Sequence, residues 1–272
     1  MPELPEVETI VRQLQKRVTG RKVKSGRVFR AKAVRGTTPV RFIKMVKGST
    51  IRSVTRRAKY ILFRLDNGYT WISHLGMTGK FVVSGAGTGN GDHTRARFSL
   101  TGNKDLVYSD LRIFGFMTVI ADEEQDAYFS RVGVEPLDEG LNADYLKQAF
   151  AKRSIPVKAA LLRQDIIAGI GNIYASEALF DAHVSPRRAV KRLTRAQLTG
   201  ITSSVKKILK KAIQYNGTTI LNYRGVDNKT GQFRSMLKVY GREDEPCVLC
   251  GTPIQRIIQA QRSTYYCPRC QK

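Results

Sequence analysis

The spacing of apolar residues predicts that the chain begins with a helix. Its apolar side chains recur at intervals of three, one, three and four residues, at Val7, Ile10, Val11, Leu14 and Val18. This is the spacing of an amphipathic helix. Gly20 comes directly after the pattern, where a glycine often ends a helix. We therefore expect a helix over residues 5–19.

From about residue 24 to residue 120 the pattern changes to short apolar runs that are typical of β-strands. Clear examples are VTRRAKYILFRL, YTWISHLG, KFVVSG and RARFSL. Turn-forming residues separate these runs, among them Asn67-Gly68 and the glycine-rich stretch GAGTGNGD. This part of the chain predicts a β-sandwich or barrel-like domain.

Beyond the polar stretch EPLDEG, the periodicity becomes helical. The helical runs are ADYLKQAFAKR, VKAALLRQDII, NIYASEALFDAH and TRAQLTGITSSVKKILKKAIQ. We therefore expect four parts. They are an N-terminal domain over residues 1–136, a linker over 137–143, a mostly helical domain over 144–236 and a small module over 237–272.

Charge adds the first indication of a partner. The chain has 47 Lys and Arg against 22 Asp and Glu, a net charge of +25, whereas solubility needs a net charge of only about 2 to 8. Eighteen basic residues and no carboxylate lie between Glu8 and Asp66, and fourteen basic residues between Asp181 and Glu243 are opposed only by Asp227. Two such stretches fit a nucleic-acid duplex held by two domains. A protein kept soluble by its charge, or one that binds RNA, remains an alternative.

Membrane association and export are not indicated. No apolar run approaches the roughly 18 to 20 residues of a membrane span. The chain opens with acidic residues, in place of the basic segment and apolar stretch of an export signal. We expect an unexported, cytoplasmic protein without a membrane partner, and a monomer.

All four cysteines lie in the last 26 residues, and they form two C-x2-C pairs separated by sixteen residues. Each pair presents two thiolates from a tight turn, so Cys247, Cys250, Cys267 and Cys270 predict a site for one structural zinc ion. Two disulfides or a redox pair are less favoured alternatives in a reducing compartment. VYGRED and STYY are expected to be hairpin strands in this module.

Three glutamates crowd the head of the chain, at Glu3, Glu6 and Glu8. Acidic residues and Pro5 suit a helix N-terminus, which gives a purely structural explanation. Removal of Met1 would instead leave Pro2 with a free secondary amine. An α-amine titrates near pH 8, so about a tenth is neutral at pH 7 and can act as a nucleophile. Glu3 could then donate or relay a proton.

Further short motifs follow the head MPELPEVET in order along the chain. They are RRAKY around Lys59, SHLGMTGKF from Ser73, YSDLRIFGF from Tyr108, AGIGNIYASEALF from Ala168, LKVYGR from Leu237 and QRSTYYCPRCQ from Gln261. Through these motifs the whole chain resembles the formamidopyrimidine-DNA glycosylase family. The resemblance implies an α+β multidomain protein, with an N-terminal β-sandwich and flanking helices, a helical helix-two-turn-helix domain and a C-terminal four-cysteine zinc finger.

The resemblance also implies an activity and its catalytic residues. The family removes oxidised purines, such as 8-oxoguanine and formamidopyrimidines, from double-stranded damaged DNA and cuts the strand by β,δ-elimination. Pro2 matches the Schiff-base nucleophile, Glu3 the general acid/base and Glu6 a supporting carboxylate. Lys59 matches a phosphate contact that assists β-elimination, and Arg262 matches the finger arginine that grips the phosphates flanking the lesion.

Other positions match DNA contacts of the family. Met77, Arg112 and Phe114 match the residues that fill the gap left by the flipped nucleotide. The remaining candidate DNA contacts are His74, His93, Arg153, Lys158 and Asn172. For Glu177 a role in pinning a helix and a role in the site are both open. The family also implies a bacterial, nucleoid-associated location during repair.

Two departures from the family pattern affect specificity. Leu111 and Ile113 stand where the family commonly has proline and a second arginine, so we expect recognition of the opposite base by Arg112 to be weaker or differently supported. The stretch 217–232 corresponds to the family's variable lesion-recognition loop. Two alternatives remain: an endonuclease VIII-like glycosylase for oxidised pyrimidines, and a non-catalytic damage-binding protein.

Overall fold

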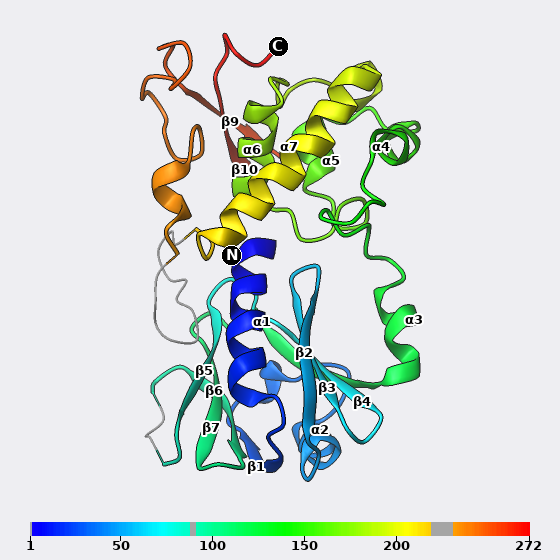
Figure 1. Cartoon of the computed structure of the whole chain (residues 1–272), viewed down its shortest axis with the longest axis vertical. Helices are drawn as coiled ribbons and strands as arrows, with labels where there is room; N and C mark the ends of the chain where they lie inside the picture. The colour runs from blue at the N-terminus through cyan, green and yellow to red at the C-terminus, as the bar shows by residue number, and fades with distance from the viewer. Residues whose placement is uncertain (1, 88–90, 219–230) are drawn as a thin grey trace. The chain divides into compact units, whose positions relative to one another are not determined.

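The chain folds into two compact units. The computed structural model describes residues 2–87, 91–218 and 231–272. One unit contains Met1–Ser130 and Tyr215–Gln232, and the other contains Arg131–Gln214 and Phe233–Lys272 (Figure 1). Residues 131–136 and 215–232 are thus grouped differently from the boundaries expected from sequence, and the four-part division remains a prediction.

The first unit is a sandwich of two four-stranded antiparallel sheets. One sheet has the order β1-β6-β7-β5, with β1 Val23–Val28, β6 Thr94–Leu100, β7 Lys104–Asp110 and β5 Gly79–Gly85. The other has the order β2-β3-β4-β8, with β2 Ile51–Arg57, β3 Tyr60–Leu65, β4 Tyr69–His74 and β8 Phe116–Ala121. The predicted β-sandwich is therefore confirmed.

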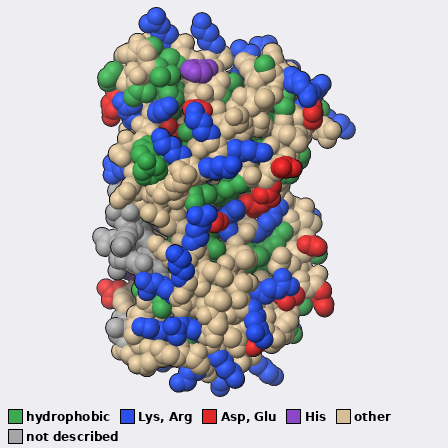
Figure 2. All heavy atoms as spheres, viewed as in Figure 1, with side chains coloured by type: hydrophobic (Ala, Val, Ile, Leu, Met, Phe, Trp, Pro, Cys, Tyr) green, Lys and Arg blue, Asp and Glu red, His purple; other side chains and the backbone are tan. Residues whose placement is uncertain are grey.

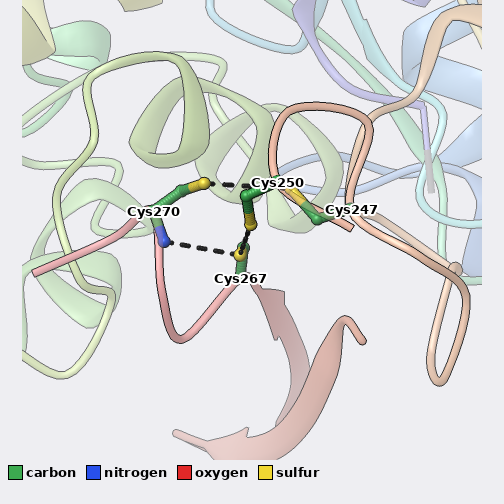
Figure 3. A group of neighbouring side chains, drawn as sticks. All are labelled: Cys247, Cys250, Cys267 and Cys270. Carbon is green, nitrogen blue, oxygen red and sulfur yellow. Dashed lines mark hydrogen bonds between the residues drawn. The ribbon is translucent and has the colours of Figure 1, made fainter. Parts of the chain in front are cut away.

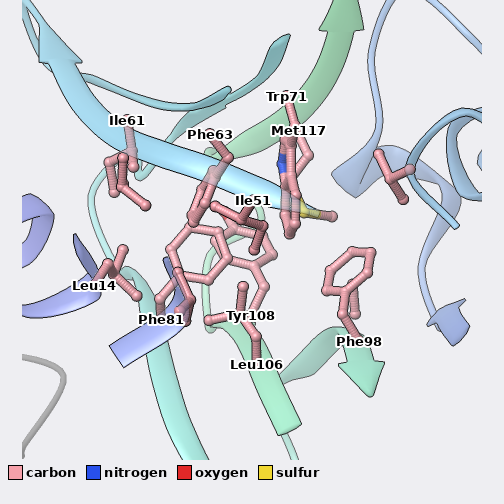
Figure 4. Packing of buried hydrophobic residues seen from close by; sticks show 14 of the residues in the cluster. Leu14, Ile51, Ile61, Phe63, Trp71, Phe81, Phe98, Leu106, Tyr108 and Met117 are labelled. Atoms are coloured by element: carbon pink, nitrogen blue, oxygen red, sulfur yellow. The ribbon is translucent and has the colours of Figure 1, made fainter. Parts of the chain in front are cut away.

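Aromatic side chains from both sheets form the core of this sandwich. Trp71, from β4, stacks on Phe63 with ring centroids 4.5 Å apart, and it lies at the same distance from Phe98 of β6. All three rings are fully buried, and Figure 4 shows them facing one another between the sheets. Burial of side chains this large is the main source of stability for such a sandwich.

Helices flank the sandwich, as expected. The predicted first helix is confirmed as α1, Leu4–Val18, and its predicted apolar positions are all buried. The shorter helices of this unit are η1 Ala31–Ala33, α2 Pro39–Val46, η2 Asp122–Glu124 and α3 Gln125–Phe129.

Helix α1 packs along β2 with the two running in opposite directions. Glu8 Oε2, near the start of α1, accepts a hydrogen bond from Arg56 Nε near the end of β2 at 3.0 Å. After the other end of α1, the Gly20 N–H donates to the carbonyl of Ile51, where β2 begins. The head of the chain and the β2–β3 turn that carries Lys59 therefore lie at the same end of the unit.

The second unit is mostly helical. Its helices are α4 Ala143–Phe150, α5 Val157–Leu161, α6 Asn172–Asp181, η3 Val190–Arg192, α7 Arg195–Gln214 and η4 Phe233–Met236. The run expected to be helical over 157–167 stops at Leu161. Gln164 binds the backbone beyond it, because its Nε2 donates to the carbonyls of Leu162 and Ile170 and its Oε1 accepts from the Gly169 N–H.

The C-terminal module contains one hairpin, formed by β9 Gln255–Gln259 and β10 Arg262–Tyr266. STYY is therefore a strand, as predicted, but VYGRED is not. The backbone N–H groups of Lys238, Val239 and Tyr240 donate to the carboxylate of Glu177, so they are not available for a strand ladder. Among the described residues, no helix has the length and apolar character needed to cross a membrane.

Candidate functional site

The head of the chain is held by the carboxylate of Glu6. Glu6 Oε2 accepts the Glu3 N–H at 2.8 Å in a capping box that opens α1, and Glu6 Oε1 accepts the Thr218 N–H at 2.7 Å. Glu3 and Glu6 are only 3% and 2% exposed, and Pro2 is buried beside them. One carboxylate thus fixes both the first residues and a segment that follows α7.

The contact with Glu6 requires glycine at position 217. Gly217 has φ +80°, and a Cβ there would lie 2.6 Å from Glu6 Oε1. A Cβ on Gly231 would lie 2.2 Å from the Gly217 carbonyl oxygen, beside the bridge between Thr218 and Gln232. Of the loop expected to recognise lesions, 219–230 lie outside the described residues, as does Met1.

Lys59 lies in the tight turn between β2 and β3. Ala58, just before it, has φ +52°, and Arg56 Nη1 donates to the Ala58 carbonyl at 3.0 Å. Lys59 is only 6% exposed. The turn therefore presents this amine from a fixed backbone at the same end of the unit as Pro2 and Glu3.

His74, at the end of β4, is a neutral imidazole with a defined tautomer. Its Nδ1 accepts the Gly76 N–H at 3.1 Å, so the ring proton belongs on Nε2. Burial, with smaller contributions from Lys59 and Arg35, lowers the pKa of His74 to about 4. The Nε2–H group is therefore a hydrogen-bond donor that does not change its charge near neutral pH.

The three expected insertion residues lie on two adjoining loops. Met77 is 40% exposed and Phe114 is 50% exposed. The guanidinium carbon of Arg112 lies 4.6 Å from the centre of the Phe114 ring, a cation–π contact. The two loops touch because the Arg112 N–H donates to Thr78 Oγ1 at 3.0 Å. Exposed apolar side chains next to a guanidinium suit insertion among bases.

Sequence reasoning missed the residue that organises these loops, Asp110. This carboxylate is 1% exposed. It accepts the Thr78 hydroxyl, the Arg112 N–H at 3.2 Å and the Gly115 N–H at 2.8 Å. Arg95 Nε donates to the Asp110 carbonyl at 2.7 Å. An Asp at the end of a predicted strand was the available clue, but many strands end in this way.

The two departures from the family pattern lie within the same loop. Leu111 is 52% exposed, and its carbonyl accepts a hydrogen bond from Arg95 Nη2 at 3.5 Å. Ile113 has φ +55°, a left-handed conformation that is unfavourable for a β-branched residue. The loop backbone therefore keeps a strained conformation with an Ile at position 113.

His93 and Arg153 are found in different units. His93 is exposed, and its carbonyl accepts the Asp110 N–H at 3.0 Å, which places it beside the loop of Arg112. Arg153 lies in the other unit, where its Nε donates to the Ala149 carbonyl and its Nη2 lies 3.8 Å from Asp165 Oδ2. The DNA-contact role of each remains a prediction.

Lys158 occupies a buried position in the second unit, and its side chain is saturated with acceptors. Its Nζ donates to Asn172 Oδ1 at 2.7 Å, to Thr264 Oγ1 at 2.7 Å and to the Ser263 carbonyl at 3.0 Å. Its exposed fraction is 0%. Asn172 Nδ2 also donates to the Ser263 carbonyl, at 2.9 Å. Lys158 therefore joins the start of α6 to β10, the strand that Arg262 begins.

Arg262 lies at the tip of the β9–β10 hairpin, next to a two-residue turn. Ala260 and Gln261, with φ +47° and +58°, form this turn, and Arg262 itself is exposed. Positive φ at both central residues is the geometry of a type I′ hairpin turn. The backbone conformation of this turn sets the direction of the chain at Arg262, and Lys158 holds Ser263 and Thr264, the two residues that follow.

The structure supports the helix-pinning role for Glu177. Its carboxylate, 1% exposed, accepts the backbone N–H groups of Lys238, Val239 and Tyr240 at 2.8 to 2.9 Å. Burial raises the pKa of Glu177, and the three N–H groups oppose that shift. The side chain thus ties α6 to the segment that enters the C-terminal module.

The four cysteine sulfurs form a cage that fits one zinc ion. They all lie within 4.8 Å of one another, and Figure 3 shows them converging from two turns. The Sγ atoms of Cys247 and Cys270 are 3.9 Å apart, and those of Cys250 and Cys267 are 3.5 Å apart. Tetrahedral zinc with Zn–S bonds of about 2.3 Å separates its sulfurs by about 3.8 Å, whereas a disulfide needs about 2.05 Å.

Family models match most of the chain. Residues 1–117 match the formamidopyrimidine-DNA glycosylase N-terminal domain, residues 132–223 its H2TH domain, and residues 244–272 a zinc finger found in FPG and IleRS. Among curated relatives, formamidopyrimidine-DNA glycosylase of Lactiplantibacillus plantarum is 41% identical and covers 98% of each chain. That of Desulfitobacterium hafniense is 39% identical over the full length of both.

Solved structures of Lactococcus lactis Fpg are also similar. A complex of the wild-type protein with DNA containing N7-benzyl-Fapy-dG has a TM-score of 0.94 and 34% identity, and it covers 100% of both chains. A complex with DNA containing an oxidised pyrimidine has a TM-score of 0.93 and 33% identity at the same coverage. At this level of identity the likeness concerns sequence as well as fold.

Removal of zinc should unfold the C-terminal module and leave the sandwich intact. The sulfur cage replaces the apolar core that so short a module lacks, so Cys247→Ser or chelation should release one zinc per chain and abolish the hairpin. Trp71 is the only tryptophan and lies in the sandwich core. Its fluorescence therefore reports whether the sandwich stays folded. Hairpin amide signals that persist in the metal-free protein would contradict this prediction.

His74 should titrate near pH 4 and remain an Nε2–H tautomer above that pH. In the unfolded chain a histidine takes up its proton near pH 6.5. The unfolded state therefore binds more protons between about pH 6.5 and 4, and His74 should lower the stability by at most about 3 kcal/mol as pH falls through this window. Nitrogen NMR of the imidazole, assigned by comparison with His74→Gln, measures both properties. A midpoint above pH 6 would contradict the prediction.

Proposed function

This chain belongs to the formamidopyrimidine-DNA glycosylase family, and from that membership we propose that it removes oxidised purines through a Schiff base at Pro2. The chain is a DNA glycosylase of base excision repair. Its lesions would be 8-oxoguanine and formamidopyrimidines.

One observation carries the proposal: the buried head of the chain and the exposed insertion residues lie at the same end of one unit. Pro2 and Glu3 are held by Glu6 at one end of the sandwich. Within the same unit, Arg112 and Phe114 project from a loop that Asp110 fixes. A nucleophile needs a fixed position, and a flipped nucleotide needs a substitute in the base stack.

The chemistry begins at the sugar carbon that carries the damaged base. The Pro2 nitrogen attacks C1′ with its lone pair, and the bond from C1′ to the base nitrogen breaks, so the base leaves with that electron pair and is then protonated. The Pro2 nitrogen, now an ammonium, loses its own N–H proton. Glu3 donates a proton to O4′ as the sugar ring opens, which leaves an iminium ion between Pro2 and C1′.

Two eliminations then cut the strand. The iminium acidifies C2′, and loss of a C2′ proton expels the 3′ phosphate. Loss of a further proton, from C4′, expels the 5′ phosphate, and hydrolysis of the remaining iminium releases the sugar fragment from Pro2. The product is a one-nucleotide gap. The zinc ion would hold the finger, since four thiolates leave no open coordination position.

The DNA contacts divide between charged and neutral groups. Lys59 assists β-elimination beside a phosphate, and His74 donates its Nε2–H to a phosphate without a charge of its own. In the second unit, Asn172 at the start of α6 and Arg262 at the hairpin tip contact phosphates. Exposed Arg112 hydrogen-bonds the base opposite the lesion.

The rival function is removal of oxidised pyrimidines. The relative from Lactococcus lactis has been crystallised with DNA containing an oxidised pyrimidine, so binding of such a lesion does not by itself separate the two functions. Relative rates of excision do separate them. A non-catalytic damage-binding protein is disfavoured because Pro2 and Glu3 are both present.

We further propose that the enzyme acts as a monomer on double-stranded DNA. One chain contains the proposed nucleophile, the insertion residues and the zinc cage. Relatives in the family come from bacteria, which supports action in the cytoplasm at the nucleoid.

A borohydride trap should capture Pro2 on lesion DNA. Reduction of the iminium should yield a covalent adduct with an 8-oxoguanine duplex, and an N-terminally extended protein should give none because its Pro2 nitrogen is part of an amide. Glu3→Gln should slow excision about 100- to 10,000-fold, since it removes the proton donor. Peptide mapping of the adduct identifies the attacking residue.

The same assay separates the rival functions. Single-turnover excision should be faster for 8-oxoguanine than for thymine glycol, and the reverse order would favour the pyrimidine-specific function. An adduct that persists in the extended protein would overturn Pro2 as the nucleophile. The mass of the mature chain shows whether Met1 has been removed.

Lys158→Met should weaken binding of lesion DNA without changing its dependence on salt. The ammonium is buried against Asn172 and Thr264, so its loss should misplace the neutral Asn172 side chain. Arg262 keeps its place at the hairpin turn, so no charged phosphate contact is lost. A direct phosphate contact would instead lower the slope of log K against log salt by about 0.9. The matched control is Lys152→Met, which removes the same charge from an exposed position. Fluorescence anisotropy over a salt series measures the slope.

A further inference from the structure

The long basic stretch from Glu8 to Asp66 is split in the fold. Its cations lie at two opposite ends of the sandwich. Lys59 and Arg35 lie near His74, at the end that carries Pro2. Other cations of the stretch lie at the opposite end, where α1 finishes and β2 begins. The sequence predicts that the whole stretch grips one duplex, but the proposed active site accounts for only part of it.

Six exposed cations from four segments of the chain define what we name the far-end surface. They are Lys22, Lys24, Lys44, Lys47, Arg52 and Lys104. Figure 2 shows Lys and Arg side chains gathered at the end of the first unit where Figure 1 labels β1 and α2.

Backbone contacts bring these segments together. Lys22 bridges to Thr50, and the Gly48 N–H donates to the Val23 carbonyl. Val23 pairs with Leu100, and Leu100 also pairs with Lys104. Lys104 therefore lies at the same end. The far-end surface is therefore a feature of the folded unit and not of one charged run.

Few carboxylates oppose this charge. Within the described part of the chain, no ion pair is formed by the far-end cations. Asp66 is nearby and interacts electrostatically with Arg52, but its Oδ1 already accepts the Thr50 N–H. Asp105 is 2% exposed and is bound to Arg97 and Ser99. The surface therefore presents almost unopposed positive charge to solvent.

Distance separates the far-end surface from the proposed active site. Helix α1 has 15 residues between them, which corresponds to about 22 Å at 1.5 Å per residue. Charges in solvent are screened beyond about 8 Å at physiological ionic strength. These cations therefore add little to the attraction of a duplex bound at the Pro2 end.

Protection of sheet edges explains only part of the surface. Lys24 lies on edge strand β1 and Arg52 on edge strand β2, where cations discourage pairing with other chains. Lys44 lies on α2, Lys47 follows α2, and Lys104 lies on the interior strand β7. A function common to all of these positions must involve their charge.

We propose that the far-end surface binds the phosphates of a second segment of duplex DNA while a first segment occupies the lesion site. The inference builds on the proposed function, because a repair enzyme bound to a chromosome is surrounded by other segments of the same polyanion. Exposed lysine and arginine suit contact with phosphates that does not depend on base sequence. Such a contact lets the enzyme pass between segments without first dissociating.

Anisotropy of a labelled, undamaged duplex tests this proposal. The protein is first saturated, one to one, with an unlabelled short duplex that carries a tetrahydrofuran abasic analogue, which has no base to lose. The labelled duplex should bind this complex in a salt-dependent manner. Lys24→Gln, Lys44→Gln, Lys47→Gln and Arg52→Gln, combined, should weaken this second binding at least tenfold and lower its salt slope by up to about 3.6.

The matched control removes the same charge from exposed lysines of the other unit, as Lys147→Gln, Lys191→Gln, Lys210→Gln and Lys211→Gln combined. Its second binding should stay within twofold of the wild type. An equal loss in this control, or no binding by the wild-type complex, would overturn the proposal. Single-turnover excision in a short lesion duplex should be unchanged in the far-end variant, and a parallel loss would assign the surface to the lesion duplex. Because the second-binding assay needs no catalysis, it can fail independently of the proposed function.

Discussion

The two hydrogen bonds accepted by Glu6 are the constraint on which the proposed chemistry depends. One holds the Glu3 N–H, and the other holds the Thr218 N–H more than two hundred residues further along the chain. An N-terminus is usually poorly ordered unless it is tied down, yet a covalent nucleophile must hold its position to a fraction of an ångström. Glu6 supplies this order from a buried helix start, where the N–H groups of α1 favour a carboxylate.

Buried charged side chains hold three other functional segments in the same way. Asp110 binds the loop of Arg112, Glu177 binds the segment that enters the zinc module, and Lys158 binds the strand that begins at Arg262. In each case a buried charged side chain contacts main-chain atoms. A buried hydrogen bond to a charged group stabilises by about 1.5 to 3 kcal/mol, and leaving such a group unsatisfied costs more. Function can therefore lie on loops that are nearly as fixed as the sheets.

Features that depend on residues close together in the sequence could be predicted, and features that depend on distant residues could not. The helix at Leu4–Val18 and the cysteine cage rest on local spacing, and both were predictable. The burial of Lys158 rests on Thr264, 106 residues away, and a basic residue alone gives no sign of such a partner. VYGRED has the composition of a strand, but Glu177 takes its N–H groups. Charge could be counted along the sequence, whereas its division between two ends of the sandwich depends on the direction of α1 against β2.

The departures at positions 111 and 113 show how such anchoring permits variation. Asp110 and Arg95 contact the loop through the N–H groups of Arg112 and Gly115 and the carbonyls of Asp110 and Leu111. None of these bonds involves the side chain at 111 or 113. A left-handed conformation costs a residue such as Ile113 roughly 1 to 2 kcal/mol, while the Asp110 carboxylate alone accepts two N–H groups and a hydroxyl, each worth about 1.5 to 3 kcal/mol. The hydrogen bonds outweigh the strain, so the loop keeps its shape, and Arg112 its position, although the side chains on either side have changed.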